Sequence, residues 1–535
     1  MNGAFRQSMT WLHTWSGLVF CWILYLLFVT GTLGYFDTEI DRWMTPEVQP
    51  SPPATLAASL QTGAAYLQRE APDADRWFIS PAGGRDNPHL GTFWQKQPEE
   101  EGAERQFGSG NVQVPSAEPV PEGRATGGGQ LLYRMHYRLH YLPGNMGFYL
   151  VAVVTMFMFI GLITGIVAHK KIFKDFFTFR WSKGQRSWLD MHNLMAVSTL
   201  PFQLMITYSG LLFTVVLWMP FVALGTYGFD TEKLLGLQEE VLGTAAPERS
   251  GSEAPLVPLA PLAAEAEAVW GDGSVRSVEV LLPGDANARV NVQRRSDFGF
   301  LGGGVMIFDG VSGELIDERD GLPNATLGVA GTLIALHEGL FAGPVLRWLY
   351  FLAGLLGTGM IATGAIYWAV KRKPKTIGAE VGFGYRFVEG MNVGTIVGLL
   401  IGVTVFFWAN RLLPVSFEAR ADWEVHCMFI AWVLCIAHGL LRPGLAAWRE
   451  QCWVLAALCL GLPVLNALTT DQHLLATMPA GDWVMAGFDL TAFGFGIAAM
   501  LSALAIGRRL KADRERPTVD VDQASALLPE GVSAG

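Results

Sequence analysis

Eight stretches of this 535-residue chain are apolar over enough residues to cross a membrane, and this feature limits the fold more than any other. A helix needs about 20 consecutive, mainly apolar residues to span the hydrocarbon layer of a bilayer. The stretches are residues 11–36, 146–169, 191–223, 344–370, 391–412, 423–441, 451–469 and 483–507. The sequence therefore predicts a mainly α-helical, polytopic membrane protein with about eight transmembrane helices.

Basic residues in the short loops predict the orientation of these spans. Lysine and arginine are frequent between spans two and three, between spans four and five, and after spans six and eight. By the positive-inside rule these loops face the cytoplasm, so both termini are cytoplasmic and the long polar segments 37–145 and 224–336 are external. The first apolar stretch is too long for a signal-peptide core and lacks a small-x-small cleavage site, so we expect a retained span.

The resulting division has seven parts, which alternate between membrane and water. They are span one at 1–36, an external segment at 37–145, spans two and three at 146–223, a second external segment at 224–336, span four at 337–375, spans five to eight at 376–507 and a cytoplasmic tail at 508–535.

Charge and cysteine content exclude several classes of protein. The net charge is −10, which argues against a nucleic-acid partner because such binding needs a basic face. Segment 37–145 holds 14 acids and 9 bases, and segment 224–336 holds 17 acids and 7 bases, so the acidity is external. All five cysteines lie in apolar stretches, which excludes a disulfide framework and a CxxC metal or redox motif.

Each external segment contains a small α+β pattern. The first predicts a helix at Leu56–Arg69 and strands at Arg76–Ser80 and Leu90–Gln95. The second predicts a helix at Leu259–Trp270, strands at Ser277–Leu282 and Arg289–Arg294, and a hairpin at Val305–Ile316 that turns at Asp309-Gly310.

An internal duplication relates spans one and three, and spans two and four. His13 precedes Gly31 by 18 residues (31 − 13), and His192 precedes Gly210 by the same interval (210 − 192). Both spans run into the same tetrapeptide, Phe-Asp-Thr-Glu, at 36–39 and 229–232. Leu-His pairs at 139–140 and 336–337 enter spans two and four, and Thr-Gly pairs at 164–165 and 363–364 lie near their ends. A span–domain–span unit therefore occurs twice in one orientation, as a pseudo-twofold axis along the membrane normal would require.

The duplication predicts two pairs of facing histidines. His13 and His192 would meet at the cytoplasmic side, and His140 and His337 would meet at the external side. Two imidazoles at each face are the axial ligand set that two b-type haems need, with the four histidines binding haem iron. No CxxCH motif occurs, which excludes covalent c-type attachment.

Several neighbouring residues are alternative or additional candidates. His169 is an alternative ligand at the cytoplasmic side, and His136, one helical turn before His140, is an alternative at the external side. Arg134, Arg138 and Arg347 would pair with haem propionates, although interfacial anchoring explains such arginines equally well.

Four sequence motifs resemble those of PepSY-associated membrane proteins. They are the runs Trp11–Leu18, His169–Arg180, Trp188–Asn193 and Phe308–Glu314. The resemblance covers about residues 1–375, and spans five to eight depart from it. The family includes inner-membrane ferric-siderophore reductases of Gram-negative bacteria. The resemblance implies di-haem binding, periplasmic PepSY-like domains and reductive release of iron, and it carries onto His13, His140, His169, His192 and His337.

Three functions follow as hypotheses. The first is an inner-membrane haem b oxidoreductase that reduces a periplasmic ferric siderophore or ferric chelate, with electrons from a membrane quinol or a soluble reductase, because no loop holds a nicotinamide fingerprint. The second is a non-enzymatic, PepSY-bearing module that binds a siderophore, peptide or protease. The third is a permease, for which Gln203, Thr207 and Tyr208 near Pro201 are the one polar cluster in a span. His426 and His438 in span six would line helix contacts, ligate further haem or help form a quinol site.

Overall fold

The structure is a computed structural model with two compact units, residues 1–368 and 369–535. It describes residues 3–83, 85, 87–96, 106–169, 171–176, 178–181, 183–214, 218, 247–296, 303–319, 325–373, 382–442 and 444–515. Within these residues, seven helices are long and apolar enough to cross a membrane, and a bent pair of shorter helices would make an eighth span. The prediction of a polytopic helical protein is confirmed.

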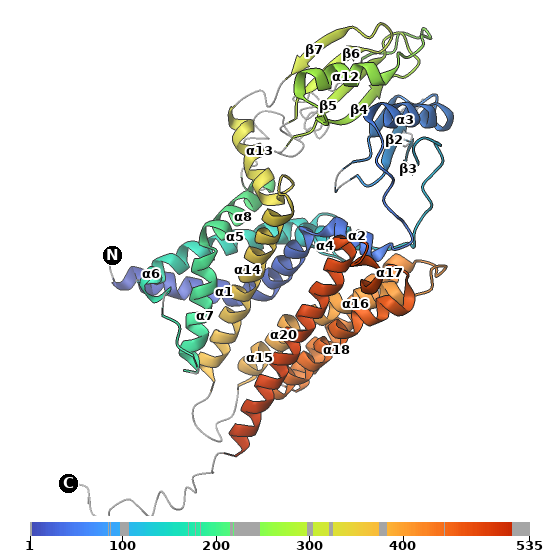
Figure 1. Ribbon diagram of the computed structural model, residues 1–535. Helices are drawn as coiled ribbons and strands as arrows, with labels where there is room; N and C mark the ends of the chain where they lie inside the picture. Colours follow the sequence, from blue (N-terminus) through green and yellow to red (C-terminus); the bar gives the residue numbers. More distant parts are fainter. Residues whose placement is uncertain are drawn as a thin grey trace, which may run out of the picture. The chain divides into compact units, whose positions relative to one another are not determined.

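The first unit contains the spans that the sequence assigns to the duplicated half (Figure 1). The straight spans are α1 (Gly3–Gly34), α5 (Met146–Ala168) and α14 (Pro344–Arg372). The bent span consists of α7 (Gln185–Ser198) and α8 (Leu200–Phe213), which meet at an angle of 68°. The bend follows from Pro201, whose ring removes a backbone donor at the start of α8. The expected span at 191–223 is thus a broken helix, and most of its end beyond 214 falls outside the described residues.

Four short helices flank the spans in the described part of the first unit. They are α2 (Asp37–Met44), which follows α1, α4 (Gly128–Arg138), which precedes α5, α6 (Ile172–Phe176), which follows α5, and α13 (Ala325–Glu338), which precedes α14. α4 packs against both α1 and α2, and α13 packs against α8. The sequence patterns had not predicted these helices.

The two polar segments build one sheet rather than two. Its seven strands are β1 (Arg76–Ser80), β2 (Leu90–Lys96), β3 (Gln106–Val112), β4 (Val275–Leu281), β5 (Arg289–Arg294), β6 (Val305–Asp309) and β7 (Leu315–Arg319). They are all antiparallel, in the order β3-β2-β1-β4-β5-β6-β7. β1 pairs with β4, with Trp77 opposite Val280, and this ladder joins the two halves.

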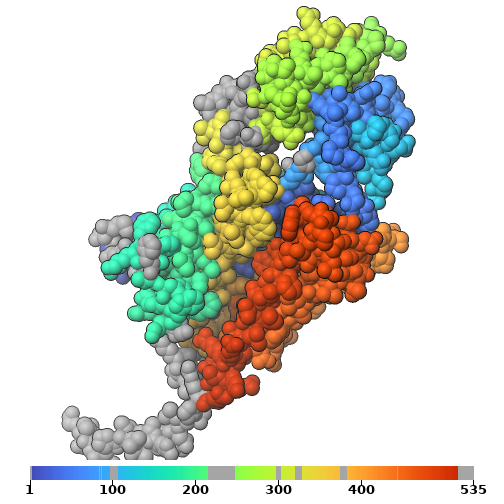
Figure 2. Space-filling view, in the orientation of Figure 1, coloured from blue at the N-terminus to red at the C-terminus, as the bar shows by residue number. Residues whose placement is uncertain are grey.

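Two helices, α3 (Leu56–Glu70) and α12 (Leu259–Trp270), pack side by side and share one core with the sheet. Leu60 and Leu67 from α3 and Ala263 and Ala266 from α12 are fully or almost fully buried there. Figure 2 shows the two halves of this region, coloured blue and green, in contact with each other. The predicted helices and five of the predicted strands are confirmed within one or two residues, and β3 was missed.

The second unit consists of α15 (Phe383–Ile396), α16 (Gly398–Leu412), α17 (Arg420–Leu441), α18 (Leu445–Thr469), α19 (Leu474–Thr477) and α20 (Trp483–Arg514). α15 and α16 together form one span, Phe383–Leu412. A buried polar network joins four of the helices. Glu424 accepts from Arg420 and from Asn410, and Asn466 accepts from Arg411 and donates to Asp489. Pairing of this kind is what keeps charges tolerable inside a span.

Candidate functional site

The structure brings His13 and His192 together. His13 lies on α1 and His192 lies on α7, and their ring centres are 6.3 Å apart with the ring planes inclined by 62°. Two imidazole nitrogens that each lie about 2 Å from one metal ion place their ring centres about 6 Å apart. The spacing of this pair therefore suits two axial ligands of one metal.

The second pair consists of His337 and His136, and this corrects the expected pairing of His337 with His140. His136 lies on α4 and His337 lies on α13, with ring centres 6.1 Å apart and ring planes inclined by 44°. His140 lies beyond the C-terminal end of α4, where its ring contacts Tyr141 at 4.2 Å. The physical reason is the end of the helix: Leu139 has a φ of 57°, so the chain turns away before His140.

All four rings are held in the same way by a neighbouring helix. His13 Nδ1 lies 2.9 Å from the Gly161 carbonyl oxygen, His192 Nδ1 2.8 Å from that of Met360, and His136 Nδ1 2.8 Å from that of Leu27. His337 Nδ1 lies 2.9 Å from Ser209 Oγ and also bonds to the Ile206 carbonyl. Each Nδ1–H is thus a donor, and each Nε2 is left as the basic nitrogen. Metal-ligating histidines in proteins show this arrangement.

A hydroxyl and a glycine complete each of these four supports. In each support, the backbone carbonyl that accepts from the imidazole also accepts from the side-chain hydroxyl of the residue three positions later. These hydroxyls belong to Thr30, Thr164, Ser209 and Thr363. The next residue is in each case a glycine, at 31, 165, 210 or 364, and the ring lies over it. A Cβ on Gly31 would lie 2.6 Å from His136, and one on Gly165, Gly210 or Gly364 would lie 3.1–3.3 Å from its histidine. The duplicated Thr/Ser-Gly pairs of the sequence are therefore supports for the four rings.

The His136–His337 pair lines a cavity of about 350 Å³. Apolar side chains form most of its wall, among them Leu24, Phe28, Val151, Met158, Phe202 and Phe213. Its polar groups include Glu338 and Tyr133, whose hydroxyl lies 3.4 Å from Glu338 Oε1. Burial lowers the pKa of His136 and, together with neighbouring His136, lowers the pKa of His337 to about 3. Both imidazoles are thus neutral, which is the form that binds a metal.

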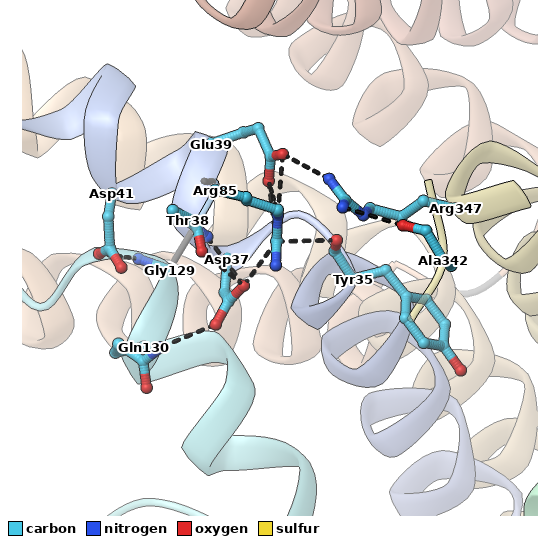
Figure 3. A network of polar contacts seen from close by, with 10 residues as sticks. All are labelled: Tyr35, Asp37, Thr38, Glu39, Asp41, Arg85, Gly129, Gln130, Ala342 and Arg347. Atoms are coloured by element: carbon cyan, nitrogen blue, oxygen red, sulfur yellow. Dashed lines mark hydrogen bonds and ion pairs between the residues drawn. The ribbon is translucent and has the colours of Figure 1, made fainter. Parts of the chain in front are cut away.

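The three arginines predicted to pair with haem propionates contact groups of the protein. Arg134 is exposed and its Nε donates to the Gln130 carbonyl, while the Arg138 guanidinium lies 5.9 Å from the centre of the Tyr137 ring. Arg347 Nη1 donates to Glu39 Oε1 at 2.8 Å (Figure 3).

His169 lies beside the His13–His192 pair rather than in it. It follows the last residue of α5, and its Nε2 lies 2.9 Å from Asn193 Nδ2, next to His192 in sequence. Arg180, in the same loop, is fixed by hydrogen bonds to both carboxylate oxygens of Asp190. The described parts of the connection between α5 and α7 are therefore fastened to α7, the helix that carries His192.

The histidines of the second unit contact other groups. His438 Nε2 lies 3.1 Å from Glu450 Oε2, its Nδ1 lies 3.2 Å from Gln451 Nε2, and the His426 ring contacts Trp423. His438 thus contacts the neighbouring helix α18, as the predicted role in helix contacts requires, whereas Trp423 lies on the same helix as His426.

The repeat interval in the sequence does not distinguish His136 from His140. To Gly165 the intervals are 29 residues (165 − 136) and 25 residues (165 − 140), and each differs by two from the 27 residues between His337 and Gly364 (364 − 337). The linker between α4 and α5 has seven residues, 139–145, and that between α13 and α14 has five, 339–343, which accounts for the longer interval from His136. The matching Leu-His pairs at 139–140 and 336–337 made His140, one helical turn after His136, the predicted counterpart of His337.

The donor set fits haem better than a metal ion bound by the protein alone. Within the described residues no group of three or more His, Cys, Asp or Glu side chains could hold a metal ion. Each pair offers two basic nitrogens, and a haem supplies the remaining four ligands of its iron.

Comparison with known proteins matches the sequence of this chain to one family. A family model described as the PepSY-associated TM region matches residues 10–371, about two thirds of the chain. A search of the curated proteins finds no match.

Proposed function

Because this chain belongs to the PepSY-associated TM family, we propose that it is a transmembrane haem b oxidoreductase that reduces a ferric chelate outside the cytoplasm. The substrate class that suits the family resemblance is a ferric siderophore, and the compartment is the periplasm of a bacterium with an inner membrane. Both termini then lie in the cytoplasm.

The observation that supports the proposal is the second histidine pair. Two pairs of facing histidines in this chain have the same carbonyl, hydroxyl and glycine support, as two equivalent binding sites in a duplicated chain would. His13 and His192 would hold one haem, and His136 and His337 the other. Bound haem would supply one-electron exchange between ferric and ferrous iron.

The residues of the chain have three tasks in this function. The Nδ1 hydrogen bonds fix the orientation of each imidazole and leave its Nε2 as the nitrogen that would bind iron. The four glycines let the rings lie against the helices, and mainly apolar side chains surround the His136–His337 pair.

The separation of the pairs suits passage of electrons across a membrane. His13 lies on α1, and Leu27, whose carbonyl holds His136, lies 14 residues further along the same helix. A helix rises 1.5 Å per residue, so the two levels are about 21 Å apart. Electrons would enter at the His13–His192 pair from a quinol or a soluble reductase and leave beside the external sheet.

The first test is a dithionite-reduced minus oxidised absorbance spectrum of the detergent-purified protein. We expect a b-type haem signal at about two haems per chain. His13→Ala and His136→Ala should each remove about half of it, and His140→Ala, the control in the linker that follows α4, should leave it unchanged. A colourless protein that binds ferric siderophore would instead favour the non-enzymatic module.

The second test measures the reaction itself. The protein reduced with dithionite is separated from excess reductant and mixed with a ferric siderophore. Reoxidation of the haem with release of ferrous iron is the expected result. A haem protein that no ferric chelate reoxidises would contradict the reductase.

A further inference from the structure

The tetrapeptide Phe36–Glu39 follows the first span, and it has an internal copy at 229–232 that lies outside the described residues. In the structure its acids start α2 together with Asp41 (Figure 3). We call Asp37, Glu39 and Asp41 the acidic hub. Three connections leave this hub, and each leads to a different part of the first unit.

The first connection leads to the sheet. Arg85, in the loop between β1 and β2, donates from Nη2 to Asp37 Oδ1 at 2.8 Å and to Glu39 Oε2 at 2.9 Å. Its Nε donates to the same Glu39 carboxylate, and its Nη2 also reaches the carbonyl of Tyr35. The guanidinium has 21% of its side-chain surface exposed and the two carboxylates have 15% and 16%, so solvent screens these contacts only in part.

The second connection leads to the helix that carries His136. Gln130 Nε2 donates to Asp37 Oδ2 at 2.7 Å, and the Gly129 amide donates to Asp41 Oδ1 at 2.8 Å. Both donors lie in the first turn of α4. Carboxylates at the start of a helix also interact favourably with its dipole, so the hub fixes the end of α4 opposite to His136.

The third connection leads to His337. Arg347, in the first turn of α14, donates to Glu39 Oε1 at 2.8 Å and to the Ala342 carbonyl at 3.0 Å. Tyr35, whose carbonyl accepts from Arg85, donates its hydroxyl to the backbone carbonyl of His337 at 3.2 Å. Glu39 is therefore shared by an arginine from the sheet and an arginine from the segment that follows His337.

From these connections we propose that the acidic hub, with Arg85 and Arg347, is a positioning element that couples the external sheet to the His136–His337 pair and adjusts the reduction potential of the haem there. The inference rests on the proposed function. Two guanidinium groups offset the charge of Asp37 and Glu39, and Tyr35, which lines the cavity of the pair, joins this network to His337. A partly buried charge acts on its surroundings more strongly than an exposed one.

The sign of each effect follows from the charge of the iron. Ferric haem carries one positive charge more than ferrous haem, so negative charge nearby favours the oxidised form. Arg85→Gln leaves Glu39 less compensated and should lower the midpoint potential of this haem. Glu39→Gln removes the negative charge and should raise it. A merely structural role would move both variants in the same direction.

A potentiometric titration of the purified protein measures both haems. The expected result is a fall with Arg85→Gln, a rise with Glu39→Gln and no change at the His13–His192 haem. Arg249→Gln is the matched control, because Arg249 also pairs with a carboxylate of the external segment, Asp75, away from the hub. Shifts of one sign in both hub variants, or shifts in the control of equal size, would overturn the proposal.

Hydrogen–deuterium exchange provides a readout that does not need haem. Arg85→Gln should speed exchange in α4 and around His337, whereas Arg249→Gln should not. If the wild-type protein contains no haem, the reductase fails while exchange still tests the coupling. If haem is bound and neither potential nor exchange responds, the coupling fails alone. Should Arg85→Gln not fold, Arg85→Lys keeps the charge and should keep the potential while exchange increases.

Discussion

At the residue scale, one small constellation occurs four times. It consists of a backbone carbonyl, a hydroxyl three residues later, a glycine after it and an imidazole from another helix. The hydroxyl and the imidazole Nδ1–H both donate to the same backbone carbonyl oxygen. Because the glycine has no Cβ, the imidazole ring can lie directly against the helix at this position.

Gly31→Ala should loosen the hold on His136. The new Cβ would lie 2.6 Å from His136 Nδ1, so the ring must move, and overfilling of this kind destabilises a core by about 1–3 kcal/mol. The haem content at the His136–His337 pair should fall, as measured by absorbance after gel filtration. Gly17→Ala in the same helix meets nothing within 4 Å and should have no effect. Equal haem content in both variants would contradict this account of Gly31.

Asp41 should make stability depend on pH. Burial raises the pKa of its carboxyl from 3.8 to about 6 in the folded protein. The folded state therefore binds more protons than the unfolded state between these values, so stability falls as pH rises from about 4 to 6. The full shift of about 2 units corresponds to about 3 kcal/mol.

Asp41→Asn keeps an oxygen for the Gly129 amide and removes this titration. Its melting temperature should fall less than that of the wild type between pH 4 and pH 6. Identical pH profiles in thermal unfolding would show that Asp41 ionises normally.

At the element scale, the ladder between β1 and β4 unites two halves that the sequence shows as separate patterns. Equivalent strands of the two copies pair antiparallel, as a twofold relationship between the copies produces. One hydrophobic core then serves both halves, so neither half has a complete core of its own.

Trp77→Ala should therefore unfold both halves together. Trp77 is 1% exposed and donates its indole N–H to the Ala71 carbonyl, and loss of such a side chain is worth about 3–5 kcal/mol. Hydrogen exchange should increase in β4 and β5 as well as in β1 and β2. Phe107→Ala on β3, where the ring is 71% exposed, is the control and should change little. Exchange confined to β1 and β2 would mean that the halves are independent.

Local patterns predicted the elements whose alternation or turn chemistry is strong. The hairpin at Asp309 is an example, because its carboxylate accepts from the Val311 and Ser312 amides and so forms the expected turn. β3 was missed because glycine and polar residues dominate it, and only pairing with β2 makes it a strand. α4 and α13 were not predicted because they adjoin the spans. Because α4 was not recognised, His140 rather than His136 was predicted to pair with His337. The partners of each ring are distant in sequence, so the carbonyl supports were not predictable.

At the scale of the whole molecule, the two histidine pairs should act in series. In vesicles of defined orientation, reductant on the side of the His13–His192 pair should reduce a ferric chelate on the side of the sheet. His136→Ala should slow this transfer at least about tenfold, while the haem at His13 and His192 still becomes reduced. His140→Ala should transfer at the wild-type rate. Transfer by His136→Ala at an undiminished rate would mean that the second pair is not on the route.

The β1–β4 ladder has a consequence for biosynthesis. The residues of β4 begin 195 positions after those of β1 end (275 − 80), with two membrane spans, α5 and the bent pair α7–α8, between them. Until the second polar segment reaches the same side of the membrane, one edge of β1 has no neighbour. Unpaired strand edges of this kind are sites of wrong association. The sheet can therefore be completed only after insertion of the bent span. A chain whose synthesis stops before that point would expose the unpaired edge of an incomplete sheet, where other strands could associate.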